Sequence, residues 1–484
     1  MRVTLRTPPS LQLMLRFLPW AALIAITTGL LAFAPRDGHY GLLLAAAPFL
    51  AAAVHGAHVT AVVGALTVSV YSAVHLWLSD DFGGVWWIKF ALVIAACAIA
   101  VLSSRARQRE LTLDRTRDIA ATLQRELLPA EAAGTATVEV CHRYTPTDTQ
   151  AGVGGDWFDV IPLSGARVAL TIGDVVGHGI KAAALMGRLR TAVQTLADLE
   201  LAPDELLTRM DVLAARLSDE DDTRDLSATC LYLVYDPITR RATMASAGHT
   251  PPALRRPDGG VEYPELPEHP PLGMGDTAFE AATTVLAEGT IVALYTDGLL
   301  DLRRSSTEEA FARLSRALGD RTESLRQLCD HVCDTVPADA DDDVALLLAR
   351  VGGMDPDRVA TWELPGTPEA VRSARKAVAH RLDAWNLPDQ AFTTELIVTE
   401  LVTNAMVHGA APITLRLIKD DALICEVADS SHAAPHPHAV HLLDENGRGL
   451  HLVARLADRW GTRRTDDGKI VWAEQSLPVS TTTN

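Results

Sequence analysis

GVGGDWFD at residues 152–159 and GDVVGHG at residues 173–179 each place an aspartate beside several glycines. The apolar run 168–172 (VALTI) leads directly into Asp174. Glycines then allow the backbone to turn tightly before a helix that we predict from Ile180. The pattern therefore predicts carboxylates at strand ends.

Two further acidic positions lie beside apolar runs. Residues 291–295 (IVALY) run into Asp297, and residues 341–343 (DDD) precede the run 344–348 (VALLL). A single aspartate at a strand end is an ordinary turn residue. Carboxylates at several strand ends can instead converge in space, and their oxygens are the ligands that Mg²⁺ and Mn²⁺ prefer. The complete set favours a metal site.

The motifs GGDWFD, GDVVGHG, AGHTPP, YTDGL and DDVALLL occur in this order along the chain. Several motifs that keep their order rarely coincide by chance. Over residues 120–351 the sequence resembles the metal-dependent Ser/Thr protein phosphatases of type 2C, in their bacterial SpoIIE-like branch. The resemblance implies an α+β domain, over about residues 130–351, in which helices flank a sandwich of two antiparallel sheets.

The same resemblance implies a set of metal ligands. Asp174, the expected catalytic residue, would bridge two Mn²⁺ or Mg²⁺ ions together with the main-chain carbonyl of Val175. Asp156 and Asp297 would complete the ligand shells, and Asp342 matches the last aspartate of the family best. Two such ions can bind one water, lower its pKa and aim it at a phosphorus. Three neighbours leave the last ligand open: Asp341, Asp343 and Asp159.

Periodicity predicts the main elements of this domain. Apolar residues at helical spacing predict two helices, and apolar runs bounded by turn residues predict strands. The helices are expected at 180–199 and 203–217, and the strands at 226–235, 242–247, 290–295 and 344–351.

Length and composition restrict the class of protein. A chain of 484 residues suggests about three domains. Its net charge of −18 argues against a nucleic-acid partner. Its six cysteines are scattered without the spacing of metal ligands, which is typical of small buried residues in a reducing compartment.

The first hundred residues contain four apolar runs, at 18–34, 41–54, 59–78 and 85–102. Together they predict a bundle of about four membrane helices over residues 1–104. A cleaved signal peptide would explain the first run but not the three that follow. The run 41–54 is the weakest, and a re-entrant hairpin with its neighbour is the alternative.

The distribution of arginines predicts the orientation of this bundle. Three arginines lie within the first 16 residues and three more at 105–109, whereas the connection 79–82 carries neither Lys nor Arg. The positive-inside rule then places both ends of the bundle in the cytoplasm. We therefore expect a multi-pass protein of the cell membrane with cytoplasmic catalytic domains.

A charged helical linker is expected at residues 105–129, where Ile119, Leu123 and Leu127 share one face and Pro129 ends the helix. It resembles the helix that precedes the catalytic domain in many SpoIIE-like phosphatases. Such a helix would transmit torsion or pair two subunits in a homodimer. A passive amphipathic spacer is the alternative.

A new pattern begins after a boundary at residues 352–361. Helices are predicted at 369–384 and 390–408, and the second places Glu400, Asn404 and His408 on one stripe. Such a stripe is usually solvated surface. Further polar and glycine-rich motifs follow here: EVAD (426–429), NGRGL (446–450), LADRWG (456–461) and Gly468-Lys469.

Residues 362–478 resemble the GHKL-type ATPase fold, an α/β two-layer sandwich, and within it the anti-sigma-factor Ser kinases. The resemblance implies that this domain binds ATP with Mg²⁺. Asn404 would bind Mg²⁺, Glu400 would be the catalytic base, and Asp429 would accept a hydrogen bond from adenine. Gly447 and Gly449 would admit the phosphates near a helix start.

One position departs from this family pattern. Ser431 stands where a glycine is usual, which is expected to narrow the adenine pocket. Residues 479–484 are expected to form a disordered tail.

The whole sequence thus predicts a multidomain, membrane-anchored protein-serine/threonine phosphatase that acts on phosphoserine in a regulatory protein. The resemblance implies a phosphorylated anti-anti-sigma factor as that partner, and a sigma factor as a further one. The alternative is a chain that is chiefly an anti-sigma-factor Ser kinase or a sigma-factor-sequestering protein, with an accessory phosphatase. A sensor histidine kinase is disfavoured, because no dimerisation helix with a phosphoacceptor histidine is predicted before Glu369.

Overall fold

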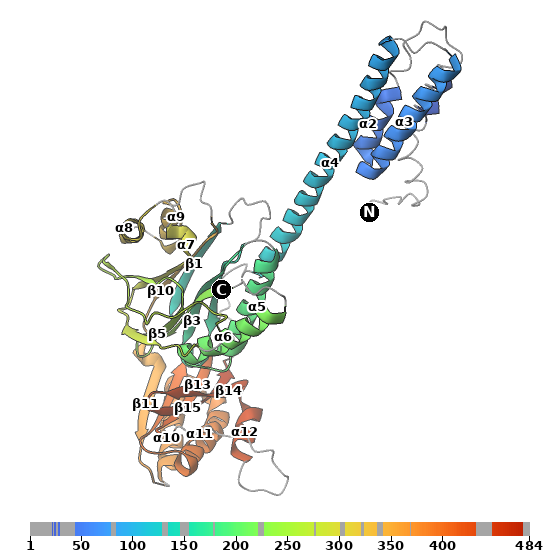
Figure 1. Cartoon of the computed structure of the whole chain (residues 1–484). Coiled ribbons are helices and arrows are strands. Elements are labelled where there is room, and N and C mark those ends of the chain that lie inside the picture. Colours follow the sequence, from blue (N-terminus) through green and yellow to red (C-terminus); the bar gives the residue numbers. More distant parts are fainter. Residues whose placement is uncertain are drawn as a thin grey trace, which may run out of the picture. The chain divides into compact units, whose positions relative to one another are not determined.

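The computed structural model divides the chain into two compact units, Met1–Ile119 and Ala120–Asn484. It describes residues 22, 24, 25, 28, 29, 44–78, 84–127, 134–145, 154–177, 180–220, 227–274, 277–300, 305–320, 324–335, 342–367, 369–431 and 448–477. Figure 1 shows the elements in sequence colours.

The first unit is helical and contains α2 (Ala46–Val54), α3 (Ala57–Leu78) and most of α4 (Gly84–Leu127). Small residues bring these helices together. Sγ of Cys97 on α4 lies 3.7 Å from the carbonyl oxygen of Gly64 on α3. Ser104 Oγ donates to the carbonyl of His55 at 3.0 Å.

Two helices among the described residues are long and apolar enough to cross a membrane. They cover Ala57–Trp77, with mean hydropathy 1.7, and Val85–Arg109, with mean hydropathy 2.3. Helix α2 has nine residues and is too short to span alone, since a crossing needs about 20. Most of the first predicted run, 18–34, lies outside the described residues. The count of four spans therefore stays a prediction.

The predicted linker helix continues the last apolar run. Helix α4 is a single element of 44 residues that passes through residues 104 and 105 without interruption. Its last residue is Leu127, and Pro129 lies outside the described residues.

The following domain is the predicted sandwich of two antiparallel five-stranded sheets. One sheet has the order β2-β3-β4-β5-β8 and the other β1-β10-β9-β6-β7. The strands of the first sheet are β2 (Trp157–Pro162), β3 (Val168–Val175), β4 (Ala228–Asp236), β5 (Arg241–Ala247) and β8 (Ala282–Val285). Those of the second are β1 (Val138–Thr145), β6 (Ala253–Arg255), β7 (Val261–Glu262), β9 (Ile291–Tyr295) and β10 (Val344–Val351).

Side chains that point alternately to the two faces of each sheet build the core between the sheets. Phe158, Leu170 and Leu231 from the first sheet pack with Leu294 and Leu347 from the second, and all five side chains are buried. The residues between them point to the outer faces, as the period of two requires.

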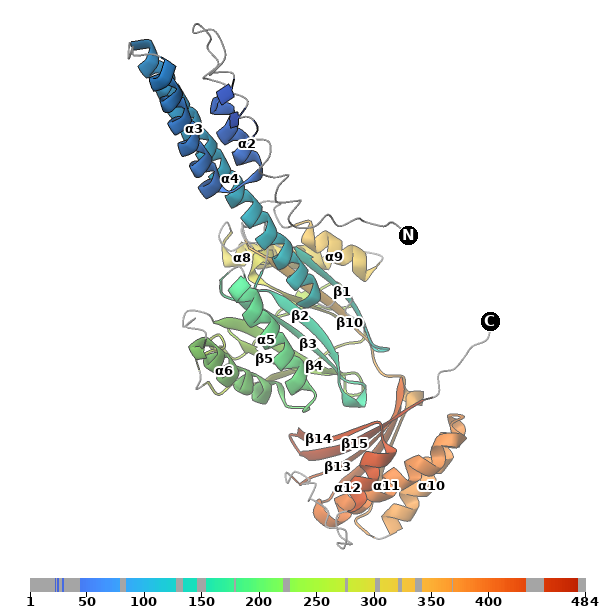
Figure 2. The same ribbon diagram turned by 90° about the vertical axis from the view of Figure 1, so that its right-hand side faces the viewer.

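Helices cover both outer faces of the sandwich (Figure 2). The first sheet packs against α5 (Ile180–Ala197) and α6 (Pro203–Glu220). The second packs against α7 (Asp297–Leu300), α8 (Thr307–Gly319) and α9 (Leu325–Cys333). The predicted helix 180–199 ends two residues early, and the chain turns at Glu200, where φ is +56°.

The C-terminal domain is the predicted two-layer α/β sandwich. Its sheet has the order β11-β12-β13-β15-β14, and its helices pack on that sheet around one core. The strands are β11 (Val359–Leu364), β12 (Ile413–Lys419), β13 (Ala422–Asp429), β14 (Arg459–Thr465) and β15 (Gly468–Ser476). The helices are α10 (Glu369–Ala384), α11 (Pro388–His408) and α12 (Arg448–Leu456).

Candidate functional site

Strands β2 and β3 bring two of the predicted carboxylates together. Trp157, the first residue of β2, is paired with Gly173 of β3. Asp156 precedes Trp157 and Asp174 follows Gly173, so the antiparallel register places the two aspartates at the same end of the sheet. The pair is therefore a product of the strand register.

The second sheet contributes its carboxylates at the end of β9 and the start of β10. Tyr295 is paired with Leu346, so Asp297 and Asp343 lie at the same end of this strand pair. Thr296, the fully buried residue directly before Asp297, connects the two sheets. Its Oγ1 donates to Oδ2 of Asp156 at 2.7 Å and accepts from the N–H of Ala345 at 2.9 Å.

The electrostatics of Asp156 and Asp174 are those of a site that lacks a counter-charge. Burial raises the pKa of Asp156 well above its usual range, and the charges of Asp174 and Asp343 raise it further. Burial also raises the pKa of Asp174 to about 6; Asp297, Asp342 and Asp343 add to this, while a hydrogen bond with Asp156 opposes it. A cation among these groups would relieve the repulsion.

Two glycines leave room among these oxygens. A Cβ atom at Gly155 would lie 3.1 Å from Oδ1 of Asp174 and would contact the carbonyl oxygen of Val175. A Cβ atom at Gly154 would contact the carboxylate of Asp343. Oxygen atoms of Asp174, Val175 and Asp343 border the space, and such oxygens suit Mn²⁺ or Mg²⁺.

The described side chains do not already form a closed cage. Within the described ranges, no three His, Cys, Asp or Glu side chains are grouped so that they would hold a metal ion as they stand. The fit to a cation therefore rests on the donor chemistry, the raised pKa values and the room left by the glycines.

The predicted ligands and the alternative aspartates lie at different positions in the structure. Asp156, Asp174, Val175 and Asp297 lie at the same end of the sandwich. Asp342 is exposed, and its Oδ1 accepts from the N–H of Asp343 at 3.0 Å. Asp342 as last ligand stays a prediction, with Asp343 as its alternative. Asp341 lies outside the described residues.

Asp159, the remaining alternative, is engaged elsewhere. Its Oδ2 lies 3.0 Å from Nη2 of Arg190 and accepts from Nε2 of Gln194 at 2.6 Å, both on α5. Asp159 is thus the acceptor of a buried ion pair between strand and helix.

The motif AGHTPP (residues 247–252) contains His249, for which the sequence predicted no role. Nδ1 of His249 lies 2.8 Å from Oγ1 of Thr229, and Nε2 lies 3.2 Å from the carbonyl oxygen of Tyr295. Burial lowers the pKa of His249 to about 4, so the ring is neutral at pH 7. His249 thus holds the end of β9, two residues before Asp297. Thr296 was also missed, because its position between two motif residues carried no signal of its own.

The predicted nucleotide residues are brought together by α11, β13 and α12. Glu400 and Asn404 lie on α11, and a Cβ atom at Gly449 of α12 would lie 2.6 Å from Oε2 of Glu400. Asp429 ends β13 and is buried. Gly447 lies outside the described residues.

The carboxylate of Asp429 has two contacts that the sequence did not predict. The N–H of Ser431 donates to Oδ1 of Asp429 at 2.9 Å. Nζ of Lys469 lies 3.2 Å from the same oxygen. Lys469 belongs to the motif Gly468-Lys469, but its contact with Asp429 was not predicted.

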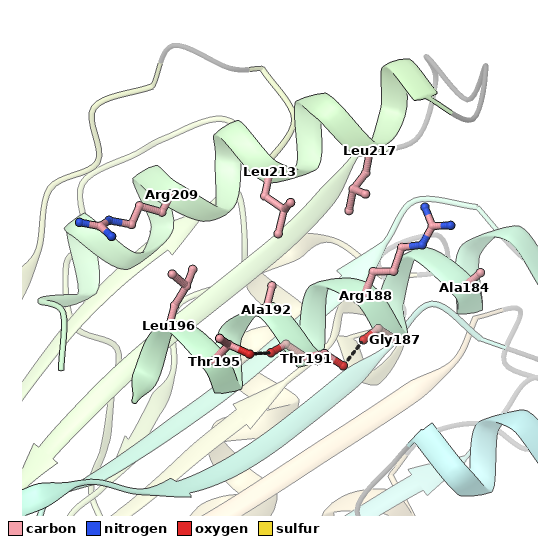
Figure 3. A pocket seen from close by; sticks show the side chains of 10 residues that line it. All are labelled: Ala184, Gly187, Arg188, Thr191, Ala192, Thr195, Leu196, Arg209, Leu213 and Leu217. Atoms are coloured by element: carbon pink, nitrogen blue, oxygen red, sulfur yellow. Dashed lines mark hydrogen bonds between the residues drawn. The ribbon is translucent and has the colours of Figure 1, made fainter. Parts of the chain in front are cut away.

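A groove of about 710 Å³ lies between α5 and α6 (Figure 3). Leu196, Leu213 and Leu217 line it, together with Arg188 and Arg209. None of the predicted metal or nucleotide residues is among its lining residues.

Two segments of the chain match known families. Residues 164–352 match the family of Stage II sporulation protein E (SpoIIE), and residues 364–474 match the histidine kinase-like ATPase domain. Asp156 precedes the first matched segment, whereas Asp174, Asp297 and Asp342 lie within it.

Curated relatives include two proteins of Bacillus subtilis (strain 168). Phosphoserine phosphatase RsbP is 30% identical over 150 residues, which are 31% of this chain and 37% of the relative. Phosphoserine phosphatase RsbU is 22% identical over 219 residues, which are 45% of this chain and 60% of the relative. The chain thus spans less than two thirds of the length of either relative.

Solved structures with similar folds include the RsbU and RsbW domains of Rv1364c from Mycobacterium tuberculosis. They are 25% identical with a TM-score of 0.42, over 71% of this chain and 96% of that one. The SiaA-PP2C domain of Pseudomonas aeruginosa is 22% identical with a TM-score of 0.41, over 51% and 98%. From the two matched segments and the two sandwiches, the chain carries a SpoIIE-type phosphatase domain followed by a histidine kinase-like ATPase domain.

Proposed function

We propose that this chain is a metal-dependent protein phosphatase that hydrolyses phosphoserine on a regulatory protein. The observation that carries the proposal is the pair Asp156–Asp174, whose pKa values are raised by burial and by neighbouring carboxylates from both sheets. Such a pair, with room left by Gly155, suits divalent cations. The names of the relatives RsbP and RsbU support phosphoserine as the substrate class.

Each residue of the site has a proposed task. Asp156, Asp174, Asp297 and the carbonyl of Val175 would hold two Mn²⁺ or Mg²⁺ ions, with Asp342 or Asp343 as the last ligand. Two bound ions would supply a water of lowered pKa and stabilise charge on the phosphoryl group.

The chain itself fixes these oxygens. Thr296 keeps the carboxylate of Asp156 oriented through a hydrogen bond of 2.7 Å. His249 holds the carbonyl of Tyr295 and with it the start of α7, where Asp297 lies. Mutation of residues that orient metal ligands in this way commonly lowers metal affinity or activity by about 10- to 100-fold.

Replacement of Asp174 by asparagine tests the proposal. The substitution removes a negative charge and an oxygen ligand, so Mn²⁺-dependent release of phosphate from a phosphoserine protein should fall by at least ~100-fold. Asp258→Asn is the matched control, because that carboxylate is exposed in a turn of the same domain. The full chain in detergent is assayed with and without Mn²⁺. Turnover near that of the wild type in Asp174→Asn would refute the two-metal assignment.

The substrate and location are proposals as well. The expected partner is a phosphorylated anti-anti-sigma factor, with a sigma factor as a further partner of the C-terminal domain. The two apolar helices support anchoring in the cell membrane, with the catalytic domains in the cytoplasm.

A second candidate function belongs to the ATPase domain. Glu400, Asn404, Asp429 and Gly449 gather around the junction of α11, β13 and α12, which suits ATP with Mg²⁺ and a Ser kinase activity. We expect dephosphorylation to dominate. Phosphate occupancy of the partner is measured after incubation with the full chain, ATP and Mn²⁺. Net gain of phosphoserine with Asp174 intact would make the chain primarily a kinase.

A further inference from the structure

Asp429 and Lys469 form a buried pair where the adjacent strands β13 and β15 of the ATPase sheet meet at their ends. The two residues lie directly opposite each other on β13 and β15. Nζ of Lys469 is 3.2 Å from Oδ1 of Asp429, and the side chains are 4% and 1% exposed. Two charges are rarely removed from water to this extent unless their remaining hydrogen-bonding groups also find partners.

Both members of the pair have groups left over. Oδ2 of Asp429 is buried and has no hydrogen-bond partner among the described residues. The ammonium of Lys469 has three N–H groups, and its contact with Asp429 is the one hydrogen bond found for it in the described part of the chain. The pair thus offers one free acceptor and free donors side by side.

The end of α11 packs closely against this pair. A Cβ atom at Gly409, directly after α11, would lie 2.6 Å from Cγ of Asp429. Glu400 and Asn404 lie on the same helix α11. The unused acceptor and donor therefore lie beside the expected nucleotide site, at the end of the helix that carries two of its predicted residues.

We propose that Lys469 contacts the nucleotide base and helps to determine which base the domain accepts. This inference rests on the proposed binding of ATP. Its Nζ donates to a ring nitrogen of the base, while an exocyclic amino group of the same base donates to Oδ2 of Asp429. Adenine fits, because its amino group and the acceptor N1 are adjacent.

Guanine fits this arrangement less well. It carries a carbonyl oxygen where adenine has the amino group, and an N–H where adenine has the acceptor N1. Oδ1 of Asp429 is already engaged by Lys469 and by the N–H of Ser431, so Oδ2 remains for one amino group. The domain should therefore bind ATP more tightly than GTP.

A purely structural role is the competing explanation, in which Lys469 only neutralises Asp429. The two explanations differ in their response to the ligand. If Lys469 touches N1, removal of N1 and removal of the ammonium abolish the same interaction. If Lys469 acts only on Asp429, the two changes are independent, and their effects on the free energy of binding add.

The test is a calorimetric titration of the full chain in detergent with Mg²⁺ and ATP, or with 1-deaza-ATP, in which a C–H replaces N1. We expect the wild type to bind 1-deaza-ATP at least about tenfold more weakly than ATP, because a hydrogen bond to a charged donor is lost. Lys469→Met should bind ATP more weakly by a similar factor and should no longer distinguish the two ligands. The matched variant Lys419→Met removes an ammonium from the neighbouring β12 that bonds to the carbonyl of Trp385, and it should retain the discrimination.

Several outcomes would overturn the inference. Equal affinity of the wild type for ATP and 1-deaza-ATP would overturn the inference. This measurement needs no variant, so it remains decisive if Lys469→Met fails to fold. Persisting discrimination in a folded Lys469→Met variant would also contradict it. If the wild type binds neither nucleotide, the ATP site fails and the inference fails with it, whereas the phosphatase proposal is untouched.

Discussion

Replacing Gly173 by alanine should destabilise the phosphatase sandwich. Gly173 lies opposite Trp157 in the register of β2 and β3, and Trp157 is fully buried. A Cβ atom at Gly173 would contact Cζ2 and Cη2 of the Trp157 ring and would lie 2.6 Å from the carbonyl oxygen of Thr229. Neither a buried ring between packed layers nor a backbone carbonyl can retreat easily.

The expected cost follows from overpacking. Inserting a methyl group into a filled core typically lowers the free energy of unfolding by about 1–3 kcal/mol. Because Trp157 follows Asp156 and Gly173 precedes Asp174, the same shift moves both carboxylates. Mn²⁺-dependent phosphatase activity should therefore fall as well, even where the chain remains folded.

The assay is a denaturant titration of the full chain, with Gly366→Ala as control because a Cβ atom there meets nothing within 4 Å. Trp157→Phe removes the clashing ring atoms and leaves a small cavity. In the double variant the alanine methyl should partly fill that cavity, so the two costs should couple by about 0.5–3 kcal/mol. Strictly additive costs, or an unchanged stability of Gly173→Ala, would refute the reasoning.

Three further predictions concern pH, the link between the sheets, and the membrane. The contribution of His249 to stability should fall by up to about 3 kcal/mol as pH drops from 6.5 toward 4, since unfolded His249 binds a proton at its usual pKa of 6.5 and folded His249 only at about 4. The raised pKa values of Asp156 and Asp174 act in the opposite direction but remain in His249→Gln, so the difference between wild type and variant in denaturant titrations isolates the histidine. Thr296→Val should lower the free energy of unfolding by about 1–3 kcal/mol and weaken Mn²⁺ binding in calorimetry, because Asp156 loses a hydrogen-bond donor and the buried N–H of Ala345 loses its acceptor. Thr296→Ser, which keeps the hydroxyl, should do neither. Reporter fusions after Ser104 should be cytoplasmic and those near Asp81 external; an external result after Ser104 contradicts the proposed orientation.

Strongly periodic elements were predicted closely, whereas some elements of similar length without a clear period were missed. Strand β10 and helix α10 have the predicted bounds, because each is a strongly periodic segment between turn residues. Strand β1 was missed, since VEVCHRYT lacks a clear alternation and lies at a sheet edge. Helix α8 was missed although Ser306 and Glu309 form a capping box, a signal that the sequence does contain.

The residues of the candidate sites also differ in how far a local sequence pattern predicts them. Asp156, Asp174 and Asp297 were predicted because each adjoins an apolar run and so lies at a strand end. The roles of Thr296 and Lys469 depend on which distant strands become neighbours. Lys469 and Asp429 are 40 residues apart and meet through the pairing of β13 with β15, which no local pattern specifies.

The hydrogen bond from Thr296 to Asp156 spans 140 residues of sequence. Contacts of such separation form late in folding, because the entropy of closing a long loop is lost before the contact stabilises anything. During synthesis, a chain that ends before β10 lacks the acidic stretch beside that strand and the partner strand of β9. The proposed hydrolytic site would therefore be completed at a late folding step, when the two sheets close on each other. A nascent chain that ends before β10 would therefore lack the proposed phosphatase activity.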